Sequence, residues 1–211
     1  MPHYSDFILT EADRTVIAGI TNADGVVNWN SESLADIKRR IKNLHLELQA
    51  DACCYCRRSL HGEFAMVIDV EHILPQCDFE SFVFLDVNLS ASCKRCNMKV
   101  KRARWDFVRD LSAEEVMRTV HDSRAYEIIH PNLDRYSDHL RRFHLAIDDG
   151  VLVKYLVRRA SPKGSKTYSF FRLYELEVDS LDKAQGLDVR DEGGWGLKVQ
   201  ELLGTSEPLT R

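Results

Sequence analysis

The chain has 211 residues, a length that suits one domain with additions or two small domains. Its composition, 44% hydrophobic and 29% charged, is typical of a soluble protein. It has no run of about 18 apolar residues that would span a membrane, and its N-terminal segment lacks the basic start and apolar core of a secretory signal, so we expect a cytoplasmic protein. The net charge of −4 excludes a general electrostatic attraction to nucleic acid, so any such binding must come from a local patch.

The first half of the chain predicts a long helix followed by a short mixed segment. Residues 31–50 are expected to form an amphipathic helix, because two serines offer N-caps and apolar residues then recur at helical spacing. Residues 64–70 form an apolar stretch that predicts a strand, and residues 88–92 predict a second extended segment. Residues 93–108 are expected to form a helix that keeps one apolar face toward the core.

The second half predicts a short helix and then mostly strands. A capping box at residues 112–115 indicates a helix that ends near residue 121. Residues 143–157 are expected to form a hairpin whose turn is Asp149–Gly150. After a loop at residues 161–166, the stretch 166–178 predicts a third strand.

These elements divide the chain into three parts. Residues 1–50 form a helical lead-in, residues 51–110 a metal-bearing core, and residues 111–211 an α+β tail. From about residue 180 onward, glycine-rich and polar stretches suggest loops around a short helix.

Four of the six cysteines form two C-x2-C pairs with 36 residues between the pairs. Since disulfides are rare in a reducing compartment, the paired spacing points to a metal. Four thiolates suit a tetrahedral structural Zn²⁺, and such a closed site leaves no position for a catalytic water. A redox pair or two coincidental pairs are the alternatives, and Cys54 and Cys77 are expected to stay outside the metal site. The four expected zinc ligands are Cys53, Cys56, Cys93 and Cys96.

Polar residues with catalytic chemistry lie between and just after the cysteine pairs. Glu71 and His72 end the first predicted strand, Asn88 opens the second, and Asn97 directly follows the last cysteine. Carboxylate and amide oxygens suit Mg²⁺ or Mn²⁺. A histidine beside such a metal can take a proton from water at neutral pH. Together these groups favour metal-assisted hydrolysis of a phosphodiester.

The stretches "CCYC", "DVEHILPQ" and "NLSASCKRCNMKVKRAR" resemble the HNH, or ββα-metal, endonucleases in the version with a four-cysteine zinc clip. The resemblance covers roughly residues 50–105. It implies an α+β protein in which a ββα-metal core, clipped by the four-cysteine zinc site, carries an N-terminal helix and a C-terminal α+β extension.

The same resemblance implies a role for each polar residue of the motif. His72 would be the general base, Glu71 and Asn97 would hold the catalytic metal, and Asn88 would brace the loop that orients His72. The chain departs from the family at Glu71, where Asp is the commoner acid, so the coordination is open and Asp69 could assist.

A basic stretch follows the last cysteine pair. Between residues 94 and 104 there are six basic residues and no acid. On a continuous helix Asn97, Lys101 and Arg104 would share one face, beside the proposed metal. Phosphates would lie there, and the alternative is an ordinary solvated helix face. No residue of the stretch predicts base-specific recognition. The expected backbone contacts are Lys94, Lys99, Lys101, Arg102 and Arg104.

The segment "HPNLDRYSDHLRRF" followed by "DDGVL" is similar to the HNH subunits of bacterial anti-phage systems of the Septu and retron-associated types. This likeness implies an ATPase partner and a DNA or tRNA target. Within the tail, Phe170, Phe171 and Trp195 are expected either to form an exposed docking surface or to fill a small core. His130 and His139 are more typical of structural histidines.

Two other functions fit the same sequence. One is a stand-alone restriction-type or mobile-element HNH nuclease. The other is a zinc-clipped nucleic-acid-binding module without catalysis.

Overall fold

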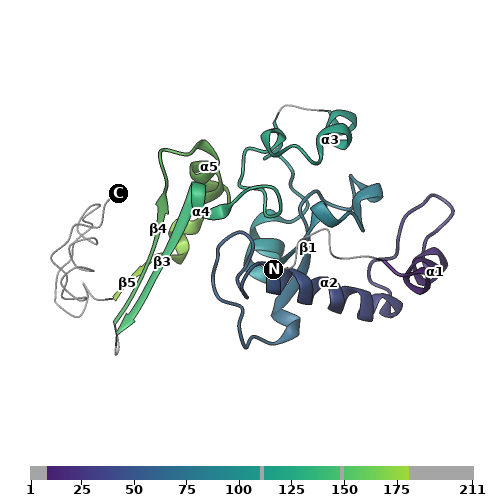
Figure 1. Cartoon of the computed structure of the whole chain (residues 1–211), viewed down its shortest axis with the longest axis horizontal. Helices are drawn as coiled ribbons and strands as arrows, with labels where there is room; N and C mark the ends of the chain where they lie inside the picture. Colours follow the sequence, from purple (N-terminus) through teal and green to yellow (C-terminus); the bar gives the residue numbers. More distant parts are fainter. Residues whose placement is uncertain (1–8, 110–111, 148–149, 181–211) are drawn as a thin grey trace.

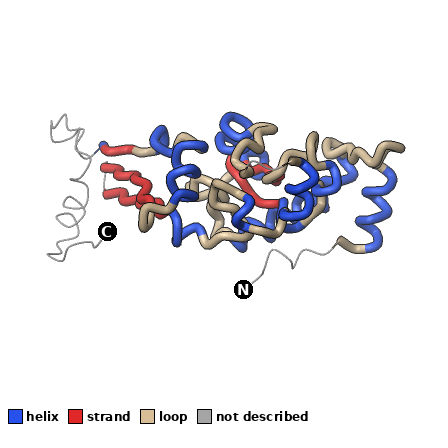
Figure 2. The backbone as a smooth tube through the Cα atoms, turned by 90° about the horizontal axis from the view of Figure 1, so that it is seen from above, coloured by secondary structure: helices blue, strands red, loops and turns tan. Residues whose placement is uncertain are grey.

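The computed structural model describes residues 9–109, 112–147 and 150–180 (Figure 1). Helices pack with two small antiparallel sheets, one made of β1 and β2 and the other of β3, β4 and β5 in that order. The three-stranded sheet lies at the end of the molecule opposite α1 and α2, and the two-stranded sheet lies between them (Figures 1 and 2). In the described ranges, no helix is both long and apolar enough to cross a membrane.

Two helices form the N-terminal part. The first, α1 (Glu11–Gly19), begins at Thr10 in a capping box with Asp13. The second, α2 (Ala35–Leu48), confirms the helix expected over residues 31–50 and follows a 3-10 turn. Its apolar stripe packs against β2, because Leu34, Ile37 and Ile41 form one buried cluster with Leu89. The stripe therefore fixes α2 across one face of the two-stranded sheet.

The two-stranded sheet pairs β1 (Ile68–His72) with β2 (Leu89–Cys93), from Ile68 opposite Cys93 to His72 opposite Leu89. The strand expected over residues 64–70 therefore starts later, because residues 65–67 form a 3-10 turn.

The helix expected over residues 93–108 is much shorter in the structure. It is a single π-helix, η6 (Arg95–Lys101), which ends where Arg102 takes a left-handed backbone with φ of 55°. Asn97, Lys101 and Arg104 consequently do not share a helix face.

The tail confirms two expected elements and corrects a third. The helix α3 (Ala113–Thr119) begins in the predicted capping box. The predicted hairpin is confirmed as β3 (Leu140–Ile147) paired with β4 (Gly150–Val157), although β3 begins before residue 143. Gly150, which was expected in the turn, is instead the first residue of β4 and pairs with Ile147, and Asp149 lies outside the described residues.

The predicted loop at 161–166 and strand at 166–178 are wrong. Residues Pro162–Phe170 form a helix, α5, because the Ser161 side chain accepts from the Gly164 N–H and Pro162 suits a first helical turn. The one short strand at the end of this segment is β5 (Val178–Asp179), which pairs with β4. A short helix, α4 (Tyr136–His139), precedes β3.

The tail packs directly on the cysteine-bearing segment. The ring of Phe171 stacks on Tyr55 at a centroid distance of 4.0 Å, and the Tyr155 hydroxyl donates to the Cys56 carbonyl at 2.6 Å. Phe170 and Phe171 are 7% and 0% exposed, so they fill a shared core and do not form a docking surface. Trp195 and the loops expected after residue 180 lie outside the described residues.

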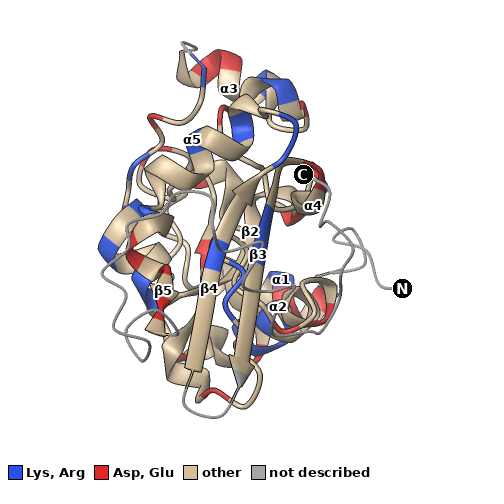
Figure 3. Cartoon of the chain, turned by 90° about the vertical axis from the view of Figure 1, so that its left-hand side faces the viewer, with Lys and Arg blue, Asp and Glu red and all other residues tan. Residues whose placement is uncertain are grey.

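His130 and His139 of the tail both contact neighbouring side chains. His130 is buried against Tyr126 at a ring distance of 4.4 Å, and His139 contacts the Ser161 hydroxyl at 2.7 Å. Lys and Arg positions and Asp and Glu positions both occur among the elements seen from the side that carries β3, β4 and β5 (Figure 3).

Candidate functional site

The four predicted cysteines meet in one buried cluster. Cys53 and Cys56 follow α2, Cys93 ends β2, and Cys96 lies on η6. Their sulfur atoms all lie within 4.8 Å of one another, and Cys56 Sγ is 3.9 Å from Cys93 Sγ. A tetrahedral zinc with Zn–S bonds of about 2.3 Å needs sulfur separations of about 3.8 Å. The cluster therefore fits a structural zinc ion.

The other two cysteines lie outside this cluster, as expected. Cys54 is buried, and its N–H donates to the Ala91 carbonyl at 3.0 Å, which ties the first cysteine turn to β2. Cys77 is exposed and lies at the edge of the neighbouring pocket. Neither thiol has a place among the four clustered sulfurs.

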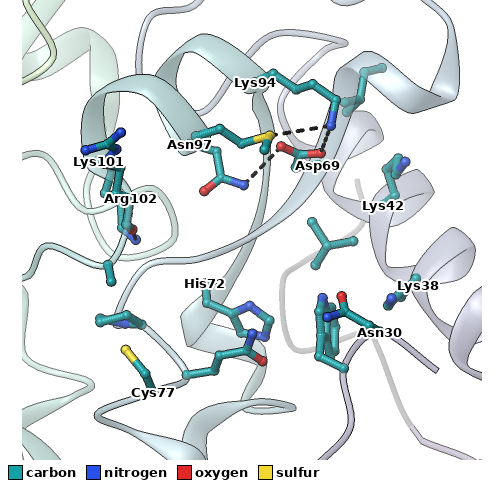
Figure 4. A pocket seen from close by; sticks show the side chains of 17 residues that line it. Asn30, Lys38, Lys42, Asp69, His72, Cys77, Lys94, Asn97, Lys101 and Arg102 are labelled. Carbon is teal, nitrogen blue, oxygen red and sulfur yellow. Dashed lines mark hydrogen bonds and ion pairs between the residues drawn. The ribbon is translucent and has the colours of Figure 1, made fainter.

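Next to the cysteine cluster, a pocket of about 610 Å³ opens between α2, β1 and η6 (Figure 4). Its wall includes His72 and Asn97 of the predicted site. Five basic side chains and a single carboxylate, Asp69, are among the described residues that line it. The pocket is thus open and lined by more cations than carboxylates, whereas the cysteine cluster is closed.

His72 ends β1 and turns its imidazole toward this pocket (Figure 4). Its Nε2 lies 3.0 Å from the Val83 carbonyl oxygen, and Trp29 packs edge-on against the ring at a centroid distance of 4.5 Å. A carbonyl only accepts, so Nε2 carries the hydrogen and Nδ1 keeps a lone pair. Burial lowers the pKa of His72 to about 4, so the imidazole is neutral at pH 7. A neutral ring with a free lone pair can accept a proton.

Asn88 lies behind this arrangement and outside the pocket. It is 1% exposed, its Oδ1 accepts from the Leu74 N–H at 2.7 Å, and its Nδ2 donates to the Phe82 carbonyl at 3.1 Å. Phe82 precedes Val83, whose carbonyl accepts the His72 hydrogen bond. Asn88 therefore fastens the loop that orients His72.

Asn97 and Asp69 lie side by side in the pocket wall. The Asn97 Nδ2 donates to one Asp69 carboxylate oxygen at 3.1 Å, and Lys94 Nζ lies 3.0 Å from the other (Figure 4). The contact with Asp69 is made by the amide nitrogen of Asn97. Carboxylate oxygens and amide oxygens are both ligands that suit Mg²⁺ and Mn²⁺.

Glu71 and Asn97 were expected to hold one metal ion together, but Glu71 does not lie beside Asn97. Consecutive strand residues point to opposite faces, so Glu71 leaves the side that His72 takes. It is fully buried, 2.9 Å from Lys101 Nζ, and accepts from the Tyr55 hydroxyl. Burial raises the pKa of its carboxyl, and Lys101 opposes that shift. The second Glu71 oxygen has no hydrogen-bond partner within the described residues.

The five basic residues that were predicted to form one phosphate-binding surface lie in different environments. The side chain of Lys101 is 2% exposed and paired with Glu71, so it is no free phosphate contact. Arg104 pairs with Asp106 at 2.7 Å and lies over the Phe170 ring, away from the pocket. Lys94 and Arg102 are exposed and line the pocket, whereas Lys99 is exposed elsewhere on η6.

Three residues of the pocket with side chains near His72 or the basic wall were not predicted from the sequence. Lys38 and Lys42 of α2 form the wall opposite Lys101 and Arg102 (Figure 4). The Trp29 ring contacts both Lys38 and His72. Lys38 and Lys42 are four residues apart on α2, a spacing that places them on one face of the helix. No feature of the sequence predicts that α2 lies across the pocket from η6.

Comparisons with known proteins give one informative match. No family model and no solved structure matches the chain. A Septu protein PtuB from Bacillus thuringiensis is 29% identical over 140 residues, which are 66% of this chain and 43% of that protein. The chain thus spans less than half the length of this curated relative.

Proposed function

We propose that this chain is a metal-dependent endonuclease of the HNH type that hydrolyses phosphodiester bonds in a bacterial anti-phage system. The observation that carries the proposal is the neutral His72 imidazole, whose Nε2 donates to Val83 and leaves Nδ1 as the acceptor, in a pocket that also presents Asp69 and Asn97. The similarity to a Septu protein supports the defence setting.

In this proposal, the pocket residues divide the chemistry of hydrolysis. His72 Nδ1 accepts a proton from the attacking water, while the hydrogen bond from Nε2 to Val83 keeps the ring in that tautomer. The oxygens of Asp69 and Asn97 would hold Mg²⁺ or Mn²⁺. A divalent cation there supplies neutralisation of the charge that develops on the phosphate.

The carboxylate assignment differs from that implied by the family resemblance. We assign Asp69 because it lines the pocket, whereas Glu71 is buried against Lys101. Zinc on the four cysteines is structural in this proposal, since the closed cluster offers no open coordination position.

The proposal includes an ATPase partner that positions a DNA or tRNA target. A net charge of −4 gives the free chain little long-range attraction to nucleic acid, so a partner that delivers the substrate would compensate. The similarity to a Septu protein supports a multi-component system without identifying the partner.

A cleavage assay with a matched pair of histidine variants tests the proposal. The full chain, alone and together with the product of the adjacent gene, is incubated with plasmid DNA and with tRNA in Mg²⁺ or Mn²⁺. His72→Ala should lower the cleavage rate by about 10²–10⁴-fold, since it removes the proton acceptor. His61→Ala is the control, because His61 is exposed and pairs with Asp51 outside the pocket. Equal rates for parent and His72→Ala would contradict the proposal.

A second candidate function is nucleic-acid binding without cleavage. It is favoured by the contacts of Asp69, whose two oxygens already meet Lys94 and Asn97. If those contacts persist in solution, they leave little room for a cation. The same assay separates the candidates, because a binding module would retain nucleic acid and cut none of it.

A further inference from the structure

The two lysines on the pocket face of α2 form no ion pair with any acidic residue that the structure describes. Lys38 and Lys42 are both half-buried, yet within the described residues neither forms an ion pair. Lys42 Nζ donates to the Ala65 carbonyl at 2.8 Å, and Lys38 Nζ lies 4.9 Å from the centre of the Trp29 ring. Half-buried cations normally have a carboxylate partner, so this pair offers its charge to something else.

The other face of the same helix shows the ordinary arrangement. Arg39 contacts Asp36, and Arg40 contacts both Asp36 and Asp13, the latter at 2.6 Å. The helix therefore neutralises its cations on the face that turns away from the pocket and leaves those at the pocket uncompensated.

The pocket adds to this positive charge. Burial lowers the pKa of both lysines, and the repulsion of neighbouring cations acts in the same direction, from Lys42 on Lys38 and from Lys94 on Lys42. Asp69 alone opposes this repulsion at Lys42, and it is already paired with Lys94. An anionic group in the pocket would relieve the repulsion.

The positions of the lysines relate them to the proposed base. Residues four apart on a helix are separated by about 6 Å along its axis, so Lys38 and Lys42 form a row. Trp29 connects one end of this row to His72, because its ring contacts both Lys38 and the imidazole. Arg102 lies on the opposite wall, so cations flank the space in front of His72 (Figure 4).

We propose that Lys38 and Lys42 bind the phosphate backbone of a nucleic-acid strand that crosses the pocket between α2 and η6, and so position a phosphodiester in front of His72. This inference rests on the proposed function and adds α2 to the substrate-binding surface. Since both lysines contact phosphates, they contribute affinity without sequence preference.

The test measures binding separately from cleavage. Fluorescence anisotropy of labelled single-stranded DNA, duplex DNA and tRNA is followed over a range of salt concentrations. The full chain carries His72→Ala, so that the probe stays intact. Lys38→Ala and Lys42→Ala are compared with Lys38→Arg and Lys42→Arg, which keep the charge. Lys166→Ala is the matched control, because it removes an equal charge from a partly exposed lysine on α5 that pairs with Glu127. Zinc content and melting temperature establish that each variant is folded.

Each alanine variant should weaken binding and reduce the slope of log affinity against log salt. The expected reduction is about 0.9 per lysine for duplex DNA and about 0.7 for a single strand. The arginine variants should keep the parent slope, and Lys166→Ala should change it by much less. The probe with the largest reduction identifies the form of nucleic acid that occupies the pocket. Unchanged affinity and slope in both folded alanine variants, or no binding of any probe, would overturn the inference.

Cleavage by the chain with His72 intact distinguishes the two proposals. If binding depends on the lysines but the chain never cuts, the inference stands and the nuclease proposal fails. If the chain cuts and both alanine variants bind and cut like the parent, the nuclease proposal stands and the inference fails.

Discussion

The cysteine cluster and the pocket share η6, where two consecutive residues serve different sites. Cys96 points into a closed group of four sulfurs, while Asn97 lines an open pocket beside Asp69. The cluster draws every ligand from the segment 53–96 and buries all of them. The pocket takes its walls from α2, β1 and η6 and from residues 29–30, 75–77 and 102–103 between the elements. The closed metal site can thus be predicted from the short spacing within each cysteine pair. The open pocket cannot, because it depends on which distant elements pack together.

The largest expected effect comes from breaking the cysteine cluster. Cys93→Ser removes one thiolate ligand, and binding of a structural zinc ion contributes about 10 kcal/mol or more to folding. The variant should lose zinc by elemental analysis, and residues 50–105 should lose protection in hydrogen exchange. Cys77→Ser should keep both, since Cys77 is exposed and outside the cluster. Folded, soluble parent protein that contains no zinc would refute the metal assignment.

The next effect lies at the boundary of the two sites, in the Glu71–Lys101 pair. Lys101→Met leaves the Glu71 carboxylate buried without its partner, which should lower the free energy of unfolding by about 3–5 kcal/mol. Urea denaturation measures this, and the double variant with Glu71→Gln should recover part of the loss. A Lys101→Met variant of unchanged stability but reduced salt dependence of DNA binding would instead support the original assignment of Lys101 to phosphate.

A smaller effect is a loss of stability in mild acid. Burial lowers the pKa of His45 to about 4 and that of His130 to about 3, whereas an unfolded histidine has a pKa near 6.5. The folded state therefore binds fewer protons, and the free energy of unfolding should fall as pH drops from about 6.5 toward 4 and change little above 6.5. The lowered pKa of Asp13 acts at lower pH.

Denaturation at pH 7.5 and pH 5 tests this expectation. His45→Leu should reduce the difference between the two pH values, because it removes one buried group that must be protonated on unfolding in acid. An equal loss in parent and His45→Leu would exclude His45 as a cause.

The sequence predicted those parts of the structure that depend on local spacing. The cysteine pairs, the helix over residues 31–50 and the hairpin of β3 and β4 all follow from residue types at short intervals. The strand predicted at 166–178 failed because Ser161 and Pro162 start a helix there, and Phe171, just after that helix, stacks on Tyr55.

The pocket was predicted only in part. The motif identified His72 and Asn97, but the opposed orientation of Glu71 and the approach of Asp69 to η6 depend on strand register and helix geometry. The lysine wall depends on α2 packing over β2, a contact between segments about 50 residues apart.

The most direct test measures cleavage by the zinc-loaded chain, with its partner where one co-purifies, as Mg²⁺ or Mn²⁺ is added. Zinc content is followed in the same samples. The account predicts that zinc stays bound throughout, that cleavage requires the added cation, and that Asp69→Asn shifts the required concentration upward more than Glu71→Gln does. Cleavage without any added cation, or a larger shift for Glu71→Gln than for Asp69→Asn, would contradict the assignment of chemistry to this pocket.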